Sequence, residues 1–358
     1  MAAWKGNYGA QTTFLSDMIV RPEFLQYVRE DIYNNCKWIQ SGAVVRNSAL
    51  DCRAGGTRVQ VPFYKPIDPT ETVIESNDKW GGDGTTTGYV NPQKITTGDQ
   101  IMTILHRAFS YANDDLSKLG SGSDPMVAVR NYLTKAINKL RTRVLIAQLE
   151  GLFGTALAAN AVDASVNTGA AEANYLSAAT VIQAQNALGE RGDELDIIAM
   201  HSHVYNYLKQ VGALTFSTSA LAASGAIVWG GGGINLNQTE VATFMGLRVV
   251  QDDMLLPTVN DGGSDQYPCY LMASGAIAEG VQQELRLATD RNILSFQDVL
   301  VCDYHYGFHV NGTKYVSADD NPTNAELADA DNWELAFTDV RMTDVVKLTV
   351  NTPFAANN

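Results

Sequence analysis

Two histidine clusters are the first groups in this sequence whose spacing could do chemistry. One holds His201 and His203, and the other places His305 and His309 beside Asp303 in the segment CDYHYGFHV. Imidazole and carboxylate groups are common metal ligands. The first cluster lies where the sequence favours a helix, and a spacing of two places the imidazoles far apart around a helix. The second alternates as an ordinary strand with aromatic cover does. We therefore expect no metal site at either cluster.

The sequence also lacks the motifs of nucleotide-binding and hydrolytic enzymes. The four-glycine run 230–233 is followed by Ile-Asn-Leu-Asn, which fits neither a P-loop nor a dinucleotide-binding turn. There is no G-x-S-x-G elbow and no H-E-x-x-H motif. Asp252 and Asp253 are adjacent carboxylates without a second cluster, which indicates the end of a strand. We expect no catalytic residue and no cofactor. Of the functions considered for this chain, a soluble α/β enzyme is therefore the least favoured.

The composition describes a globular chain with an acidic balance. Of its 358 residues, 45% are hydrophobic and 18% are charged, below the usual share of about a quarter charged. A low charge content fits a surface that neighbouring subunits cover. The net charge of -14 argues against an electrostatic nucleic-acid binder, because such binding needs cations to neutralise phosphates.

Cysteine usage and hydropathy predict a soluble protein made in a cytoplasm. The four cysteines show no CxxC pair and no zinc spacing, so we expect reduced and mostly buried thiols. No apolar run has the length of a signal peptide or of a membrane span. We therefore expect no membrane partner.

The longest predicted element is a helix from Asp124 to Gly154. Asp124 suits the N-cap, Pro125 suits the first helical position, and Gly151 and Gly154 are expected to end the helix. An apolar stripe at helical spacing widens from Val144 onward, so this end should enter a core. At about 1.5 Å per residue the helix would span roughly 45 Å.

Upstream of this helix, the period of the pattern changes to two. Alternation over 57–61 and over 94–108 predicts two strands of a hairpin. Between them lie about thirty residues rich in Pro, Gly, Thr and Asp, and loops of that length are usually functional or disordered. Trp80 is flanked by glycine and lysine at the tip, and it is a candidate anchor on another subunit because aromatic residues are enriched in interfaces. The alternative is a flexible loop with one exposed tryptophan.

Downstream, the predicted helices and strands alternate. A helix over 175–188, a strand over 195–200 and a helix over 201–211 indicate an α/β or α+β unit. Further strands are expected at 247–251, 270–273, 284–287, 298–303, 306–310 and 346–350. The last of these should return to close a sheet.

The middle of the long helix is unusually basic. Five of the 25 basic residues fall within fourteen positions, in a chain with 39 acidic residues: Arg130, Lys135, Lys139, Arg141 and Arg143. They could form a solvated face. They could instead meet acidic groups of a neighbouring subunit or of an internal partner.

The order of these elements resembles that of the major capsid proteins of tailed bacteriophages, which share the HK97-like fold. The resemblance covers nearly the whole chain and rests on sequential agreement, since no single motif is diagnostic. The segments that carry it are TFLSDMIVRPEF, YANDDLSKLGSGSDPMVAVRNYLTKAINKL, ALGERGDELDIIAMHSHVYNYLKQVG, GLRVVQDDMLLP and DYHYGFHVNGTKYV.

The resemblance implies an α+β fold with four named parts. These are an N-arm (1–50), an E-loop hairpin (51–108), a P domain (109–175, with a spine helix over 124–153) and an A domain (176–294), followed by a return to the P domain (295–358). It also implies hexamers and pentamers that tile an icosahedral shell around double-stranded DNA, without sequence-specific binding. The protein would be assembled in the host cytoplasm and would end in the virion.

The same resemblance suggests partners and contact residues. The chain begins almost at once with the arm, so we expect a separate scaffolding protein, together with a portal and, optionally, decoration proteins. We do not expect covalent crosslinks. The candidates for contacts between subunits are Phe14, Arg58, Phe63, Tyr64, Lys79, Trp80, Arg130, Lys135, Arg141 and Arg143. An encapsulin-like compartment shell, which has the same fold, is the alternative function.

Overall fold

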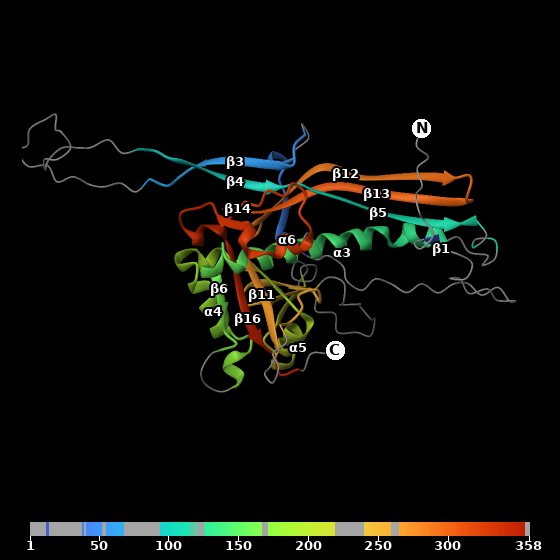
Figure 1. The fold of residues 1–358 in the computed structure, drawn as a ribbon. Coiled ribbons are helices and arrows are strands. Elements are labelled where there is room, and N and C mark those ends of the chain that lie inside the picture. Colours follow the sequence, from blue (N-terminus) through green and yellow to red (C-terminus); the bar gives the residue numbers. More distant parts are fainter. Residues whose placement is uncertain are drawn as a thin grey trace, which may run out of the picture.

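A 30-residue helix, α3 (Pro125–Gly154), lies between an upper layer of strands and a lower body of strands and helices (Figure 1). The computed structural model describes residues 12–13, 38, 41–51, 55–67, 94–115, 117, 119, 125–166, 171–218, 240–258 and 265–354. The predicted long helix is confirmed, although its expected N-cap Asp124 lies outside the described residues. The predicted burial beyond Val144 is also confirmed, since Leu145, Leu149 and Leu152 are at most 1% exposed.

A five-stranded sheet lies above α3, in the order β1-β5-β13-β12-β2 (Figure 1). Its strands are β1 (Thr12–Thr13), β5 (Leu105–Asp114), β13 (Gln297–Val310), β12 (Ile277–Asn292) and β2 (Val44–Arg46). Alternate residues of β13 are buried and share a hydrophobic core with α3, among them Leu300, Cys302, Tyr304 and Tyr306. This alternation packs one face of the sheet on the helix.

A seven-stranded sheet forms the lower body, in the order β6-β16-β11-β7-β10-β9-β8. Its strands are β6 (Ala161–Asp163), β16 (Val345–Asn351), β11 (Gln266–Met272), β7 (Ile197–Met200), β10 (Leu247–Gln251), β9 (Glu240–Phe244) and β8 (Thr215–Thr218). Helices α4 (Ala178–Asn186) and α5 (Ser202–Val211) share a second hydrophobic core with it. The βα alternation predicted for this region is confirmed.

A third, four-stranded sheet carries a projecting hairpin. Its order is β15-β14-β4-β3, with β15 (Trp333–Leu335), β14 (Thr313–Tyr315), β4 (Thr97–Thr103) and β3 (Arg58–Tyr64). One further short α-helix, α6 (Asn324–Ala328), contacts α3. Short 3-10 helices connect these elements at Ser48–Leu50, Ala158–Asn160, Ala171–Asn174, Gly189–Glu194, Ala330–Asn332 and Val340–Thr343.

Two of the predicted strand boundaries are wrong. The single strand expected over 94–108 is two strands, since the chain passes at the buried Ile104 from β4 of the hairpin to β5 of the five-stranded sheet. The strands expected over 298–303 and 306–310 are one strand, β13. β12 belongs to the five-stranded sheet, whereas β16 returns to the seven-stranded sheet.

Gly151 does not end the helix, contrary to the prediction. It lies inside α3, where a Cβ atom would stand 2.2 Å from the Leu327 carbonyl oxygen and 2.8 Å from Trp333 Nε1. The glycine is therefore needed for close packing, and Gly154 is the residue at which the helix ends. The tip of the predicted hairpin around Trp80 lies outside the described residues.

One tryptophan joins the N-terminal part of the chain to the junction of the sheets. Trp38 is fully buried, and its indole Nε1–H donates a 2.6 Å hydrogen bond to Asp252 Oδ2, just beyond β10. Its ring also lies 6.2 Å from that of Tyr270 on β11. Asp252 is 5% exposed, so this bond satisfies a buried carboxylate.

Replacing Trp38 by phenylalanine should lower the free energy of unfolding by about 2 to 3 kcal/mol, because the buried Asp252 carboxylate loses the indole donor while it keeps the Met254 N–H. Urea unfolding of the purified subunit measures this loss. Trp333→Phe is the matched control, since Trp333 Nε1 donates to a neutral acceptor, the Leu327 carbonyl oxygen, at 2.9 Å. The control should lose about 1 kcal/mol. Equal losses in the two variants would contradict the role assigned to the Asp252 charge.

Candidate assembly surfaces

The described part of the β3–β4 hairpin projects past the edge of the lower body of the molecule (Figure 1). Its base is fixed within the chain, because the Arg58 guanidinium donates to the carbonyl oxygens of Ser317 and Asp319 at 2.5 and 3.2 Å. The same group lies 3.6 Å from the Asp320 carboxylate. Arg58, a predicted contact between subunits, therefore has its partners in its own chain.

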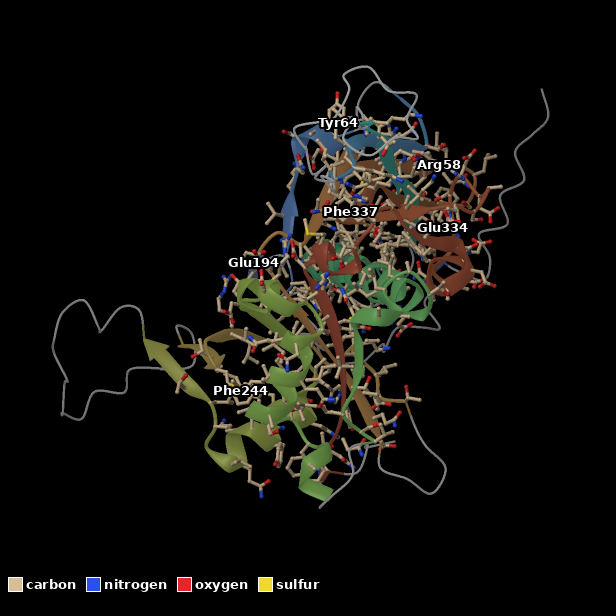
Figure 2. All side chains as sticks on the ribbon, turned by 90° about the vertical axis from the view of Figure 1, so that its left-hand side faces the viewer. Arg58, Tyr64, Glu194, Phe244, Glu334 and Phe337 are labelled. Atoms are coloured by element: carbon tan, nitrogen blue, oxygen red, sulfur yellow. The ribbon has the colours of Figure 1, made fainter. Side chains whose placement is uncertain are left out.

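The next two predicted contact residues, Phe63 and Tyr64, are neighbours on β3, so their side chains point to opposite faces of the hairpin. Phe63 packs edge-to-face on Phe337, with ring centroids 5.1 Å apart, and a Cβ atom at Gly98 would lie 2.6 Å from its ring. Tyr64 is 78% exposed and lies farther from the body than Phe337 (Figure 2). Tyr64 is thus the more exposed residue of this pair, whereas Phe63 is half-buried. Outside the described part of the chain lie Phe14, Lys79, Trp80 and the side chain of Arg130.

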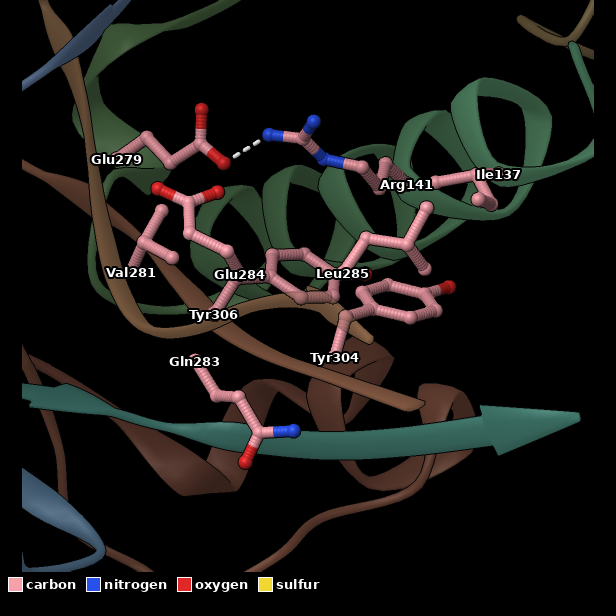
Figure 3. Close-up of a pocket in the computed structure, with 9 residues that line it drawn as sticks. All are labelled: Ile137, Arg141, Glu279, Val281, Gln283, Glu284, Leu285, Tyr304 and Tyr306. Carbon is pink, nitrogen blue, oxygen red and sulfur yellow. Dashed lines mark hydrogen bonds and ion pairs between the residues drawn. The ribbon is translucent and has the colours of Figure 1, made fainter. Parts of the chain in front are cut away.

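The basic residues of α3 do not form one surface. The Arg141 guanidinium is paired with Glu279 of β12, and it lies 5.4 Å from the ring of Tyr306, where a cation–π attraction adds to the pair (Figure 3). The side chains of Arg141 and Glu279 are only 20% and 8% exposed. Arg143 is exposed and Lys135 is half-buried. Of the alternatives considered for these basic residues, contact with an acidic group inside the subunit applies to Arg141, whose partner is Glu279 of the same chain.

A small cavity adjoins the Arg141–Glu279 pair (Figure 3). It has a volume of about 90 Å³, and both polar and apolar side chains line it: Ile137, Arg141, Glu279, Val281, Gln283, Glu284, Leu285, Tyr304 and Tyr306. Leu285 is 42% exposed, so one wall of the cavity is formed by a side chain that also reaches solvent. The cavity lies between the helix and the outer strand of the sheet.

The far end of the β12–β13 hairpin carries an exposed apolar tip that the sequence analysis missed. Ile293, Leu294 and Phe296 are 77%, 94% and 62% exposed, and Phe296 has a positive φ of 52°. Monomeric proteins rarely expose such clusters unless the surface binds something. The sequence holds these three apolar residues between the end of β12 at Asn292 and the start of β13 at Gln297. The strands were predicted at 284–287 and 298–303, which is too short to show that a tight turn joins them.

The histidines have protein partners. His106 Nε2 and His305 Nδ1 each lie 3.2 Å from Gln282 Oε1, and their rings are 4.3 Å apart. Burial, and then the neighbouring His106, hold the pKa of His305 below its ordinary value. Burial likewise lowers the pKa of His201, which caps α5 by accepting the His203 N–H. Within the described part of the chain, no three His, Cys, Asp or Glu side chains form a group that could hold a metal ion.

Of the histidines with a lowered pKa, His309 is the most deeply buried and should make the largest contribution to the pH dependence of stability. It is buried with its Nε2–H 2.8 Å from Gln100 Oε1, and burial lowers its pKa from 6.5 to about 4. The unfolded chain binds a proton more readily, so the folded state loses stability as the pH falls from about 6.5 to 4. The loss should reach about 3 kcal/mol.

Unfolding free energies at pH 7.5, 6, 5 and 4 test this expectation with the His309→Gln variant, which retains a donor for Gln100. The variant should lose less stability over this range than the parent chain. His203→Gln serves as the control that keeps His309. An unchanged pH dependence in the His309 variant would assign the acid sensitivity to other groups.

A comparison with protein families bears on all of these surfaces. The family model described as major capsid protein 13-like matches residues 85–346, which include α3 and most strands of the three sheets, although β1, β2, β3 and most of β16 lie outside the match. The chain belongs to this family of major capsid proteins. The major capsid protein of Bacillus phage SPP1 is 28% identical over 335 residues, covering 91% of this chain and 94% of the relative.

Solved capsid structures share the fold of this capsid protein. The capsid of Ralstonia phage GP4 aligns with a TM-score of 0.62 at 10% identity, over 94% of this chain and 97% of the other. The capsid asymmetric unit of cyanophage Pam1 aligns with a TM-score of 0.58 at 13% identity, over 98% and 99% of the two chains. The predicted α+β, HK97-like fold is confirmed.

The capsid protein is a structural component of a tailed-phage virion, which confirms the main functional prediction over the compartment and enzyme alternatives. Its family membership implies a structural and non-enzymatic role. No helix in the described ranges is long and apolar enough to cross a membrane.

Proposed function

We propose that this chain assembles as hexamers and pentamers into an icosahedral shell that encloses a double-stranded DNA phage genome. The observation that carries the proposal is the shape of the subunit. The β3–β4 hairpin and the β12–β13 hairpin project from opposite sides of the body (Figure 1). Each exposes aromatic or aliphatic side chains that a solitary subunit would leave in water, including Tyr64 and Leu294. Overlap with neighbours would bury them, as in large obligate interfaces.

The charge of the chain supports containment of DNA rather than recognition of it. A net charge of -14 disfavours tight binding to phosphates, because few counterions would be released. A shell lining of this kind would not hinder packaging or ejection of the genome. The proposal therefore includes contact with packaged DNA but no sequence-specific binding.

The proposal also includes the partners that shell assembly requires. We expect a separate scaffolding protein, a portal and, optionally, decoration proteins, with assembly in the host cytoplasm. Residues 1–50 would serve as the N-arm, 51–108 as the E-loop, and α3 as the spine of a P domain. The A domain would correspond to most of the seven-stranded sheet with α4 and α5, and its strand β16 comes from the C-terminal segment.

Negative-stain microscopy after size exclusion tests the proposal, with the chain produced alone and together with the scaffolding protein of the same phage. Closed shells, tubes, or rings of five or six subunits are expected. A monodisperse monomer or dimer under all salt and scaffold conditions would overturn the proposal. Absorbance at 260 nm of particles from infected cells should show nucleic acid, and protein cargo without DNA would point to a compartment instead.

Tyr64 should affect assembly without affecting the fold. Tyr64→Ala removes a side chain that is 78% exposed in the subunit, so the free energy of unfolding should change by less than about 0.5 kcal/mol. Loss of an interface aromatic typically costs about 2 kcal/mol or more, which should raise the critical assembly concentration at least tenfold. Light scattering over a concentration series measures this value.

Phe63→Ala is the matched control for Tyr64, because it truncates the adjacent aromatic that packs on Phe337. The control should lower the stability of the subunit itself. An unchanged critical concentration in Tyr64→Ala would exclude Tyr64 from the contacts between subunits.

A further inference from the structure

Among the described residues, nothing pairs with the outer edge of β12 over half of its length. β13 pairs with β12 from end to end, but on the other side β2 pairs only with Ile277–Glu279. All eight residues from Glu284 to Arg291 are exposed, and no strand in the described part of the chain pairs with their outer edge. Eight residues exceed the usual strand length of about five or six. An open edge of this length is a template for another strand.

The register with β13 shows which side of the sheet each residue of this edge occupies. Leu287 stands opposite the fully buried Cys302, so Leu287 is on the side of the sheet that faces α3. By alternation, Arg286, Ala288 and Asp290 share the other side. This side therefore carries a cation, a small residue and an anion in sequence along the open edge.

Symmetry restricts how this edge could pair with the same edge of a second copy. Two identical antiparallel strands are related by a two-fold axis perpendicular to the sheet, and directly opposed residues point to the same side. If Ala288 of one copy stands opposite Ala288 of the partner subunit, Arg286 stands opposite the partner's Asp290. By symmetry, Asp290 then stands opposite the partner's Arg286. With Leu287 or Thr289 on the axis instead, both pairs are lost. The charges thus favour one register, which has the smallest side chain at its centre.

The charged groups are also available for such a contact. Asp290 forms no ion pair with any described residue, and only its Oδ1 is used, by the backbone N–H of Arg291 at 2.8 Å. Arg286 is 69% exposed and binds Asp303 through Nε and one terminal nitrogen, at 3.1 and 2.7 Å. A guanidinium has five N–H donors, so a second carboxylate can be added without breaking this bond.

We propose that β12 of two copies pairs edge to edge, antiparallel and centred on Ala288, to form a continuous sheet across a two-fold contact between neighbouring capsomers. The location between capsomers rests on the proposed shell, because icosahedral symmetry supplies two-fold axes there. The pairing itself rests on the open edge and its self-complementary charges.

Disulfide trapping tests the pairing. Shells of Ala288→Cys are treated with oxidised glutathione, which accepts the electrons released as the two thiols join, and are then analysed on a non-reducing gel. Directly opposed Cβ atoms in an antiparallel pair lie about 4.5 to 5.5 Å apart, near the range that a disulfide spans. A linked dimer should be the main product. Thr289→Cys, which would oppose Leu287 of the partner subunit, and the parent chain should give at least tenfold less dimer.

A charge reversal provides the second measurement. In the Ala288→Cys background, Asp290→Arg would oppose Arg286 of the partner subunit, so the rate of dimer formation should fall at least tenfold. Asp298→Arg makes the same change of charge on β13, away from the axis, and should leave the rate unchanged. Equal effects of the two reversals would overturn the proposed register.

The failure of this inference can be told apart from failure of the proposed function. Intact Ala288→Cys shells that give no disulfide-linked dimer would overturn the pairing but not the proposed shell. This conclusion would hold both if alkylation shows that the introduced thiol is accessible and if it shows that another segment covers the thiol. Absence of any particle from the parent chain would overturn the proposed function itself.

Discussion

Replacing Gly151 by alanine should lower the free energy of unfolding by about 3 kcal/mol, although alanine is the better helix former. In a helix interior the exchange alone should stabilise by about 1 kcal/mol. Here the added Cβ would stand 2.2 Å from the Leu327 carbonyl oxygen. This oxygen cannot move away easily, since it accepts the Trp333 Nε1–H at 2.9 Å. The resulting overpacking should outweigh the helix propensity.

Urea unfolding of the purified subunit measures the effect. Arg143→Ala is the control on the same helix, at an exposed position, and it should change the free energy of unfolding by less than about 0.5 kcal/mol. An increase in stability for Gly151→Ala would show that α6 and β15 can move away from α3. Shell formation by the variant should fall in parallel, because the packing of α6 and β15 on the helix is part of the subunit that assembles.

Gly151 also shows where sequence analysis reaches its limit. Helical spacing, Pro125 and Gly154 were sufficient to place α3, since they act within a few residues of one another. The role of Gly151 depends on Leu327, 176 positions later, and glycine is so frequent at helix ends that the sequence favoured the local interpretation. The strand divided at Ile104 has the same cause, because an alternating pattern persists when a strand leaves one sheet for another.

The assembly surfaces were predictable to a similar extent. The hairpin and its period of two were predicted correctly, but the pattern could not show that Phe63 packs on Phe337 of its own chain while Tyr64 remains exposed. The basic cluster of α3 was recognised by its charge, but only the packing of β12 on α3 reveals that Arg141 pairs with Glu279. Elements with local causes were found, whereas partners distant in the sequence required the structure.

Removing the carboxylate of Glu279 should have a comparable effect on stability, because it leaves the guanidinium of Arg141 without its partner. Glu279→Leu should lower the free energy of unfolding by about 3 kcal/mol, since both side chains are largely withdrawn from water. The cost arises from the unpaired charge rather than from a large net value of the pair. The double variant Arg141→Met, Glu279→Leu should therefore recover most of the loss.

A double-mutant cycle in urea measures this coupling, with Arg141→Met as the fourth corner. Arg143→Glu is the control, because it makes a larger change of charge two positions away, at an exposed site, and should leave the stability of the subunit nearly unchanged. If the double variant were as unstable as Glu279→Leu alone, the stability would come from the packing of these side chains and not from their charges. The pair joins α3 to β12, so loss of assembly in Glu279→Leu that the double variant restores would also show that the shell needs this sheet held against its helix.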